Sequence, residues 1–277
     1  MQVTLAGVSA RHPAARPGAQ PALQPLTLSV QRGEQLAVIG PSGAGKTTLL
    51  HVLACAHRPL GGALGLDGVD PWRLPRRALQ RLRGSLFLAP QVPPLPPRQR
   101  VVTAVLAARL PQMGLLSSLR SLFYPKDIPA AYEALARFDL ADKLFDRVDR
   151  LSGGERQRVG LTRALLAPAT LWLIDEPLSA LDPTRAQQAT AALVAGARAR
   201  GATLVATLHQ VDMALAHFPR IVGLRDGAMA FDLPAAEVTR ERLAALYAQH
   251  EHELTGEAPA PLEDRPVPAP VPVMHCR

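Results

Sequence analysis

Short apolar runs and helical patterns alternate along most of the chain. The apolar runs are bounded by turn residues or charges and cover residues 35–39, 86–89, 171–174, 203–207 and 221–224. Strands that are covered on both faces lose the alternation of apolar and polar residues, so these runs predict buried strands of a mostly parallel sheet. Helical patterns cover residues 45–56, 130–138, 153–166, 183–199 and 240–249. Strands that alternate with helices predict an α/β fold.

Two segments depart from this alternation. Residues from about 92 to 165 contain helical patterns without a convincing strand, and we expect them to form a helical subdomain inserted in the α/β core. Residues 250–277 are rich in proline and have no helical or strand period, which predicts an extended, disordered tail. The folded domain is therefore expected to cover residues 1–249.

Composition adds a basic balance to this picture. The chain has 277 residues and a formal net charge of +8, from 31 Lys and Arg against 23 Asp and Glu. This balance favours an acidic partner such as a nucleotide, a nucleic acid or a lipid surface, although basic residues scattered over the surface would give the same charge. Cys55 and Cys276 are too few for a disulfide framework or a zinc site, which is consistent with a reducing compartment.

The pattern predicts no membrane-spanning or targeting segment. Every run of about 18 residues is interrupted by a charge or a proline. The N-terminal residues MQVTLAGVSARHP lack a charged start followed by an apolar stretch, so we expect no secretory signal. The chain is expected to stay in the cytosol and to reach a membrane only through a partner.

A glycine-rich turn follows the first predicted buried strand. Residues 40–47 read GPSGAGKT and fit the pattern G-x-x-x-x-G-K-[ST] between a strand and a helix. Gly40, Gly43 and Gly45 let the backbone turn tightly and point its N–H groups at phosphate oxygens. Lys46 supplies a mobile cation for the β- and γ-phosphates, and the Thr47 hydroxyl is placed to coordinate Mg²⁺. The alternative is a strand-to-helix turn with an incidental lysine.

Two carboxylates end another predicted strand. Residues 171–176 read LWLIDE, and the C-terminal edge of a parallel sheet is where α/β folds place their ligands. Asp175 suits the role of a Mg²⁺ partner, and Glu176 suits that of a general base or orienter for the attacking water. A solvated acidic turn after a strand is the alternative.

A third motif begins a helix. Residues 151–158 read LSGGERQR, in which Ser152 and Glu155 form a capping box. Gly153 and Gly154 each cost roughly 1 kcal/mol in a helix compared with alanine, and a purely structural cap has no use for them. A helix start that phosphate approaches closely does use them, so a second anion site is predicted beside the alternative of an ordinary cap.

These motifs together resemble the ATP-binding subunits of ABC transporters over residues 1 to about 249. LSGGERQR at 151–158 precedes LIDEP at 173–177, SALD follows at 179–182, and the isolated His209 follows the strand TLVAT. The resemblance implies a P-loop NTPase core with a mostly parallel, RecA-like sheet, a small antiparallel β subdomain and a helical subdomain. It also implies ATP hydrolysis with Mg²⁺, by two copies that face each other head to tail.

The resemblance implies roles for individual residues. The nucleotide site would contain Gly40, Pro41, Ser42, Gly43, Ala44, Gly45, Lys46, Thr47 and Thr48 of one copy, with Ser152, Gly153 and Gly154 of the other. Glu176 would activate water, His209 would contact the γ-phosphate, and Asp182 would lie at the dimer junction. Gln91 would sense Mg²⁺, alongside Thr47 and Asp175, and the membrane partner. His12 occupies the place of the usual adenine-stacking aromatic residue, and its ring stacks less strongly than tyrosine.

Two other positions depart from the family pattern. Glu155 replaces the usual glutamine, and its capping role is expected to turn it toward the Ser152 backbone. Pro90 stands before Gln91 where an aromatic residue is usual, and the proline-dense loop PQVPPLPPRQR follows. The groove that receives a membrane partner is therefore expected to differ in shape.

A narrower resemblance points to the ATP-binding subunits of phosphonate importers. It is carried by the stretches VLAARL at 105–110, SSLRSLF at 117–123, TLHQVDMA at 207–214, RIVGLRDG at 220–227 and VTRERLAALY at 238–247. It implies uptake of phosphonate or a related phosphorus oxyanion, with permease subunits, a solute-binding protein and a second ATPase subunit as partners. The implied location is the cytoplasmic face of the inner membrane, as a peripheral subunit.

Three other functions are compatible with these motifs. One is an ABC importer ATPase for another small solute. A second is a soluble ABC ATPase that acts on nucleic acid, which the basic charge favours, but such proteins commonly carry two ATPase units or a coiled-coil insertion. A small-molecule P-loop kinase is the third, although residues 152–155 would have no purpose there. We expect no nucleic-acid partner.

Overall fold

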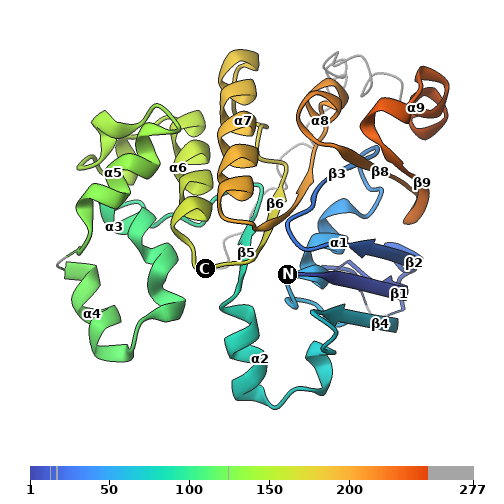
Figure 1. Ribbon diagram of the computed structural model, residues 1–277, viewed down its shortest axis with the longest axis horizontal. Helices are drawn as coiled ribbons and strands as arrows, with labels where there is room; N and C mark the ends of the chain where they lie inside the picture. The colour runs from blue at the N-terminus through green and yellow to red at the C-terminus, as the bar shows by residue number, and fades with distance from the viewer. Residues whose placement is uncertain (13, 17, 124, 249–277) are drawn as a thin grey trace, which may run out of the picture.

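The computed structural model describes residues 1–248 except 13, 17 and 124 (Figure 1). The predicted tail at 250–277, with Cys276, lies outside the described residues. Strands of the described part form two sheets, one in the order β5-β6-β7-β3-β8-β9 and one in the order β2-β1-β4. In the described ranges no helix is both long and apolar enough to cross a membrane.

The larger sheet contains all five predicted strands. Its members are β5 (Leu86–Ala89), β6 (Leu171–Asp175), β7 (Thr203–Thr207), β3 (Gln35–Ile39), β8 (Arg220–Arg225) and β9 (Ala228–Pro234). Neighbouring strands pair in parallel except β9, which runs antiparallel to β8. Every residue of β3, β6 and β7 is buried, which explains why these strands show no polar alternation. The predicted mostly parallel sheet is confirmed.

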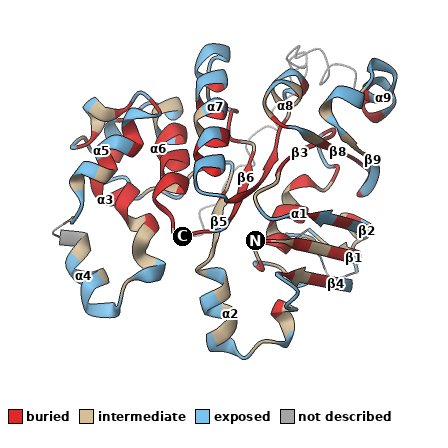
Figure 2. Cartoon of the chain, viewed as in Figure 1, coloured by how far each residue is buried: buried red, intermediate tan, exposed pale blue. Residues whose placement is uncertain are grey.

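The two faces of this sheet belong to different cores. In β3, Ala37 and Ile39 pack into one core with the helices α3 and α5–α9, while Leu36 and Val38 pack into the other core with α1 and the small sheet. Successive strand residues point to opposite faces, so a single buried strand supplies both layers. Figure 2 shows the buried strands between these partly exposed layers.

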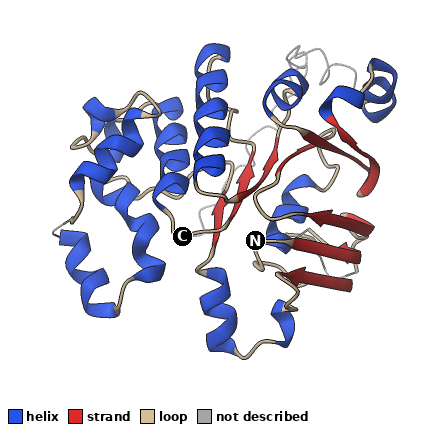
Figure 3. Ribbon diagram, in the orientation of Figure 1, coloured by secondary structure: helices blue, strands red, loops and turns tan. Residues whose placement is uncertain are grey.

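The smaller sheet is antiparallel and lies beside α1 in Figure 3. It consists of β1 (Val3–Ala10), β2 (Leu23–Val30) and β4 (Gly61–Leu66). The continuous apolar runs did not mark these strands, because burial of only one face gives alternating rather than continuous apolar residues. The family resemblance did imply a small antiparallel subdomain, and that fold class is confirmed.

Helices surround the larger sheet. They are α1 (Lys46–Leu53), α2 (Arg76–Arg83), α3 (Val101–Leu106), α4 (Leu115–Phe123), α5 (Ile128–Ala136), α6 (Gly153–Leu166), α7 (Pro183–Ala199), α8 (Val211–His217) and α9 (Arg240–Leu246). Short 3-10 helices cover Pro71–Arg73, Ala107–Gln112, Ala141–Lys143, Val148–Arg150 and Ala235–Glu237. Figure 1 shows α3, α4, α5 and α6 together on one side of the sheet. The predicted bounds of α6 and α7 are confirmed, whereas α1 ends before Cys55, which has a φ of 53°.

Candidate active site

The turn between β3 and α1 requires glycine at two positions. Gly40 has a φ of 151°, and an added Cβ there would lie 2.0 Å from the Leu224 carbonyl oxygen. Gly45 has a φ of 96°, and its Cβ would lie 2.5 Å from the Ala22 carbonyl oxygen. Any side chain at either position would collide with backbone that cannot move freely. The fold therefore holds this loop in one conformation at the start of α1.

Lys46 lies across the inside of this loop. Its side chain is 4% exposed, and Nζ donates hydrogen bonds to the carbonyl oxygens of Gly40 at 2.7 Å and Pro41 at 3.2 Å. Nζ also lies 3.9 Å from Oε1 of Glu176. A buried ammonium needs such partners, because burial without them is costly. Lys46 thus places a positive charge between the loop and the acidic end of β6.

Asp175 receives two hydroxyl donors at the end of β6. Oγ1 of Thr207 donates to its Oδ1 at 2.7 Å, and Oγ1 of Thr47 approaches the same oxygen at 3.3 Å. Within the described ranges, no group of three or more His, Cys, Asp and Glu side chains could hold a metal. The Thr47 hydroxyl, the Asp175 carboxylate and the side-chain amide oxygen of Gln91 are nonetheless hard ligands of the kind that Mg²⁺ takes together with substrate phosphates. The residues present therefore fit Mg²⁺ bound with a nucleotide.

Three side chains from separate segments, those of Lys46, Gln91 and His209, surround the carboxylate of Glu176. Its Oε1 lies 2.6 Å from Nε2 of His209, and its Oε2 accepts a hydrogen bond from Nε2 of Gln91 at 2.9 Å. Burial favours the neutral carboxyl, but the His209 hydrogen bond and the nearby charges of His209 and Lys46 outweigh it and hold the pKa of Glu176 below its usual range. The carboxylate is therefore ionised at neutral pH, and its side chain is only 13% exposed.

Lys46, Thr47, Gln91, Glu176 and His209 line one open cavity of about 500 Å³, which is within the usual range for small-molecule sites. Its lining consists of His12, Ala22, Ser42, Gly43, Ala44, Gly45, Lys46, Thr47, Thr48, Gln91, Glu176 and His209. All of these except Ala22 were predicted from the sequence as nucleotide or catalytic residues. The structure thus brings together predicted residues from five separate segments of the chain.

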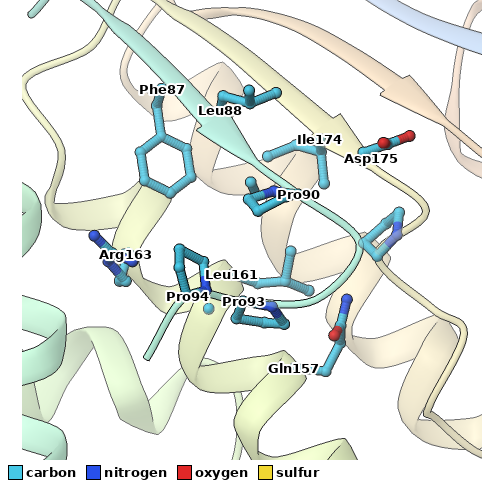
Figure 4. Close-up of a pocket in the computed structure, with 13 residues that line it drawn as sticks. Phe87, Leu88, Pro90, Pro93, Pro94, Gln157, Leu161, Arg163, Ile174 and Asp175 are labelled. Atoms are coloured by element: carbon cyan, nitrogen blue, oxygen red, sulfur yellow. The ribbon is translucent and has the colours of Figure 1, made fainter. Parts of the chain in front are cut away.

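The proline-dense loop after β5 determines where Gln91 lies. Figure 4 shows Pro90, Pro93 and Pro94 beside Phe87, Gln157 and Arg163 in a pocket between β5 and α6. Gly160 of α6 accommodates this loop, because a Cβ on Gly160 would lie 2.7 Å from Cγ of Pro93. Close packing of the prolines on α6 therefore holds the segment that carries Gln91 in a position where Gln91 contacts Glu176.

The start of α6 forms the predicted capping box. The Ser152 N–H donates to Oε2 of Glu155 at 2.7 Å, and the Glu155 N–H donates to Oγ of Ser152 at 3.2 Å. The hydrogen bond from the Ser152 backbone N–H lowers the pKa of Glu155 although burial opposes it. Glu155 is therefore turned toward the backbone, as expected.

Gly154 has a structural purpose at the start of α6, so the prediction that a structural cap has no use for it was wrong. A Cβ on Gly154 would lie 2.9 Å from the Ala180 carbonyl oxygen, so this glycine has a structural purpose in addition to any ligand. In the part of the chain that the structure describes, a Cβ on Gly153 would meet no atom within 4 Å. Only Gly153 therefore leaves its space open.

Seven predicted residues are not among the described lining of the cavity around Lys46, namely Gly40, Pro41, Asp175, Ser152, Gly153, Gly154 and Asp182. Gly40, Pro41 and Asp175 adjoin the cavity through their contacts with Lys46 and Thr47, whereas Ser152, Gly153, Gly154 and Asp182 lie at the starts of α6 and α7. Asp182 is the N-cap of α7, where its Oδ1 accepts from the Arg185 N–H at 3.0 Å and its Oδ2 lies 3.6 Å from Nε of Arg185. A single copy therefore supplies one part of the predicted nucleotide site.

Sequence reasoning missed Thr207. This fully buried threonine ends β7, donates to Asp175 and accepts a hydrogen bond from the Glu176 N–H at 3.0 Å. The available signal was a hydroxyl at the C-terminal end of an apolar strand, two residues before His209. The sequence did not show that β7 lies beside β6, so the Thr207 hydroxyl could not be placed next to Asp175.

A phosphate loop on a parallel sheet, facing an acidic strand end, defines a P-loop nucleotide-binding protein. A family model described as ABC transporter matches residues 23–179, and the chain belongs to that family. The predicted family is thereby confirmed.

Relatives match over the whole chain. The protein named phosphonates import ATP-binding protein PhnC 2 of Albidiferax ferrireducens is 70% identical over 278 residues, which cover 100% of both chains. PhnC of a Polaromonas species is 69% identical over 277 residues, again with 100% of both chains covered. PhnC 1 of Pseudomonas aeruginosa PAO1 is 53% identical over 260 residues, which cover 94% of this chain and 96% of the relative.

Solved structures agree with the fold. A dimeric ATP-binding cassette in a post-hydrolysis state bound to ADP and Pi has a TM-score of 0.70 and 25% identity, covering 84% of this chain and 98% of that one. A nucleotide-free cassette has a TM-score of 0.68 and 21% identity, covering 90% of this chain and 96% of that one. The chain therefore has the ATP-binding cassette fold.

Proposed function

We propose that the chain is the ATP-hydrolysing subunit of an ABC importer that takes up phosphonate or a related phosphorus oxyanion. The observation that carries this proposal is the full-length identity of 70% to a protein named for phosphonate import, combined with the cluster around Glu176. Phosphite and phosphate esters are included because they share the oxyanion group. An importer of another small solute is the alternative that the family membership leaves in place.

The nucleotide is bound through its phosphates. Backbone N–H groups of residues 40–48 and the positive end of α1 surround the β- and γ-phosphates. Lys46 exchanges its hydrogen bonds to the carbonyls of Gly40 and Pro41 for phosphate oxygens. Thr47, Asp175 and Gln91 hold Mg²⁺, which neutralises phosphate charge when it is bound. His12 lines the same cavity and stacks on the base.

Glu176 is the general base for hydrolysis. Its ionised carboxylate takes a proton from water as the water oxygen bonds to the γ-phosphorus, and the bond from that phosphorus to the bridging oxygen of ADP breaks. His209 holds the carboxylate at 2.6 Å and contacts the γ-phosphate. Hydrolysis therefore depends on residues that lie just beyond the ends of two adjacent strands.

A second copy completes the site. Ser152, Gly153 and Gly154 of one copy face the phosphates bound by the other in a head-to-tail dimer, with Asp182 at the junction. Their separation from the described lining of the cavity supports this arrangement, as does the dimeric form of a similar cassette. The open space around Gly153 provides room for a phosphate oxygen to approach the start of α6.

The partners follow from import. Permease subunits bind at the helical subdomain, which covers about residues 92–165 of the ATPase domain 1–249. Movement of the permease displaces the segment around Gln91, and the hydrogen bond from Gln91 transmits this displacement to Glu176. A solute-binding protein delivers the oxyanion to the permease. The chain is a peripheral subunit on the cytoplasmic face of the inner membrane, and nucleic acid is not a partner.

The test is reconstitution of the transporter in vesicles with its permease and solute-binding protein. We expect an alkylphosphonate or phosphite to raise MgATP hydrolysis, whereas a sugar or an amino acid leaves it at the basal rate. Stimulation only by an unrelated solute would remove the phosphonate assignment. Stimulation by nucleic acid that falls steeply with salt would instead support the soluble ATPase.

A further inference from the structure

A buried hydroxyl connects the two acidic residues of the site. Thr207 is the last residue of β7 and pairs in register with Asp175, the last residue of β6. Its side chain is fully buried, so its hydrogen bonds are made inside the protein rather than with bulk water. Glu176 follows Asp175 directly. The Thr207 hydroxyl therefore lies beside both Asp175, the proposed Mg²⁺ ligand, and Glu176, the proposed general base.

The hydroxyl makes one hydrogen bond to each neighbour. Oγ1 of Thr207 donates to Oδ1 of Asp175 at 2.7 Å and accepts from the backbone N–H of Glu176 at 3.0 Å. A threonine hydroxyl has a single proton, so the bond to Asp175 uses its whole donor capacity. A hydrogen bond to a carboxylate also polarises the bond that the same hydroxyl accepts. The Thr207 side chain thus orients the Asp175 side chain and the Glu176 backbone together.

The backbone of Glu176 needs such support. Its φ is 44°, a left-handed conformation that a residue with a Cβ adopts only when its surroundings enforce it. This conformation turns the chain out of β6 and directs the carboxylate toward His209 and Lys46. The Thr207 hydroxyl accepts the N–H of this same residue and therefore stabilises the turn.

Thr207 also holds Asp175 independently of Thr47. Both hydroxyls approach Oδ1 of Asp175, Thr207 at 2.7 Å and Thr47 at 3.3 Å. If the Thr47 hydroxyl were to turn toward a metal ion, Asp175 would retain the shorter hydrogen bond from Thr207.

We propose that Thr207 is a positioning residue for ATP hydrolysis, which sets the orientation of Asp175 toward Mg²⁺ and of Glu176 toward water. This inference rests on the proposed hydrolytic function. Valine at position 207 preserves the shape but leaves the Glu176 N–H without its acceptor and Asp175 without its donor. Serine restores both hydrogen bonds.

The test compares Thr207→Val and Thr207→Ser with Thr203→Val. Thr203 is a matched control because it is fully buried at the other end of β7, donates to the Met1 carbonyl at 2.6 Å and accepts from the Gly33 N–H at 3.0 Å. For each variant one measures kcat, the Mg²⁺ concentration for half-maximal activity, the affinity for a fluorescent ATP analogue in EDTA and in Mg²⁺, and the melting temperature.

We expect Thr207→Val to lower kcat by about tenfold or more and to raise the half-maximal Mg²⁺ concentration. Its affinity for the analogue in EDTA should stay within about threefold of the unmodified chain, while the gain in affinity on adding Mg²⁺ shrinks. Thr207→Ser should restore both properties. Thr203→Val should lower the melting temperature without changing the Mg²⁺ dependence.

Two results would overturn the inference. In the first, Thr207→Val loses stability as Thr203→Val does but keeps its Mg²⁺ dependence, so the residue is only structural. In the second, Thr207→Ser fails to rescue. An unmodified chain that hydrolyses no ATP even with its permease would contradict the proposed function instead, which separates the two failures.

Discussion

Nε2 of His209 lies 2.6 Å from Oε1 of Glu176, at the ends of neighbouring parallel strands. This contact counteracts the burial of the carboxylate and lowers its pKa. The residue proposed to take a proton from water is thereby kept ionised inside a mostly buried site. A general base must be deprotonated before it acts, so the contact has a direct consequence for the pH dependence of turnover.

Removal of His209 should shift the acid limb of the pH–rate profile. In His209→Ala, burial continues to favour the neutral carboxyl while its main opposing contact is lost, so the pKa of Glu176 rises. We expect the fall in kcat at low pH to begin at higher pH than in the unmodified chain. His209→Gln, which retains a donor, should shift less. An acid limb that is identical in all three proteins would contradict this role for His209.

The same contact should affect stability in acid. A folded-state pKa below the unfolded value of about 4.3 contributes stability at higher pH, and that stability disappears as pH falls through the folded pKa. Between pH 5 and pH 3, the range in which a carboxyl titrates, we expect chemical denaturation to show a smaller loss of unfolding free energy for His209→Ala than for the unmodified chain. An equal or larger loss in the variant would exclude a lowered pKa of Glu176 as the cause.

The two glycines of the α6 start should respond in opposite directions. Gly154→Ala forces a Cβ to within 2.9 Å of the Ala180 carbonyl oxygen and should cost about 1–3 kcal/mol of unfolding free energy. Gly153→Ala meets open space within the described chain and should leave stability equal or slightly higher. Thermal and urea unfolding measure both. If Gly153→Ala nevertheless lowers ATPase activity, a ligand at this position is supported; unchanged activity would argue against one.

Gly160 should influence catalysis through the proline loop. Gly160→Ala drives a Cβ into Pro93 at 2.7 Å and moves the segment that carries Gln91. We expect kcat to fall while ATP affinity is retained. Combining Gly160→Ala with Gln91→Ala tests the route, because losses that act through one group are not additive. Fully additive losses would show that Gly160 acts elsewhere.

Glu155 should act through its capping bonds. Glu155→Gln keeps an oxygen acceptor for the Ser152 N–H and should unfold within a few tenths of a kcal/mol of the unmodified chain. Glu155→Ala removes that acceptor and should cost about 0.5–1 kcal/mol. Urea unfolding distinguishes them. Equal destabilisation by both substitutions would mean that charge, rather than the cap, matters.

Burial explains which elements the sequence predicts. The strands β3, β6 and β7 are buried along their whole length, so apolar composition alone marks them. Each residue of α2 is at least partly exposed, and its apolar face consists mainly of Leu79 and Leu82, which is too short a pattern to define the bounds of a helix. The small sheet needed the family resemblance, because β1, β2 and β4 share only one buried face with α1.

Site residues were predictable where chemistry depends on a local motif. The loop residues Ser42 to Thr48 are adjacent in sequence, and they line the cavity as a group. Contacts made in three dimensions were not predictable. Neither the support of Glu176 by Thr207 nor the packing of Gly160 on Pro93 follows from spacing, since each depends on how distant segments pair.

The most direct measurement is the fate of ATP in Glu176→Gln. The substitution preserves the shape of the side chain and one of its two hydrogen-bonding oxygens but removes the base. We expect hydrolysis to fall by about 10²- to 10⁴-fold, with ATP affinity retained and a nucleotide-bound dimer visible by sedimentation velocity. Hydrolysis near the rate of the unmodified chain would contradict the account, because the proton of the attacking water would then have another acceptor.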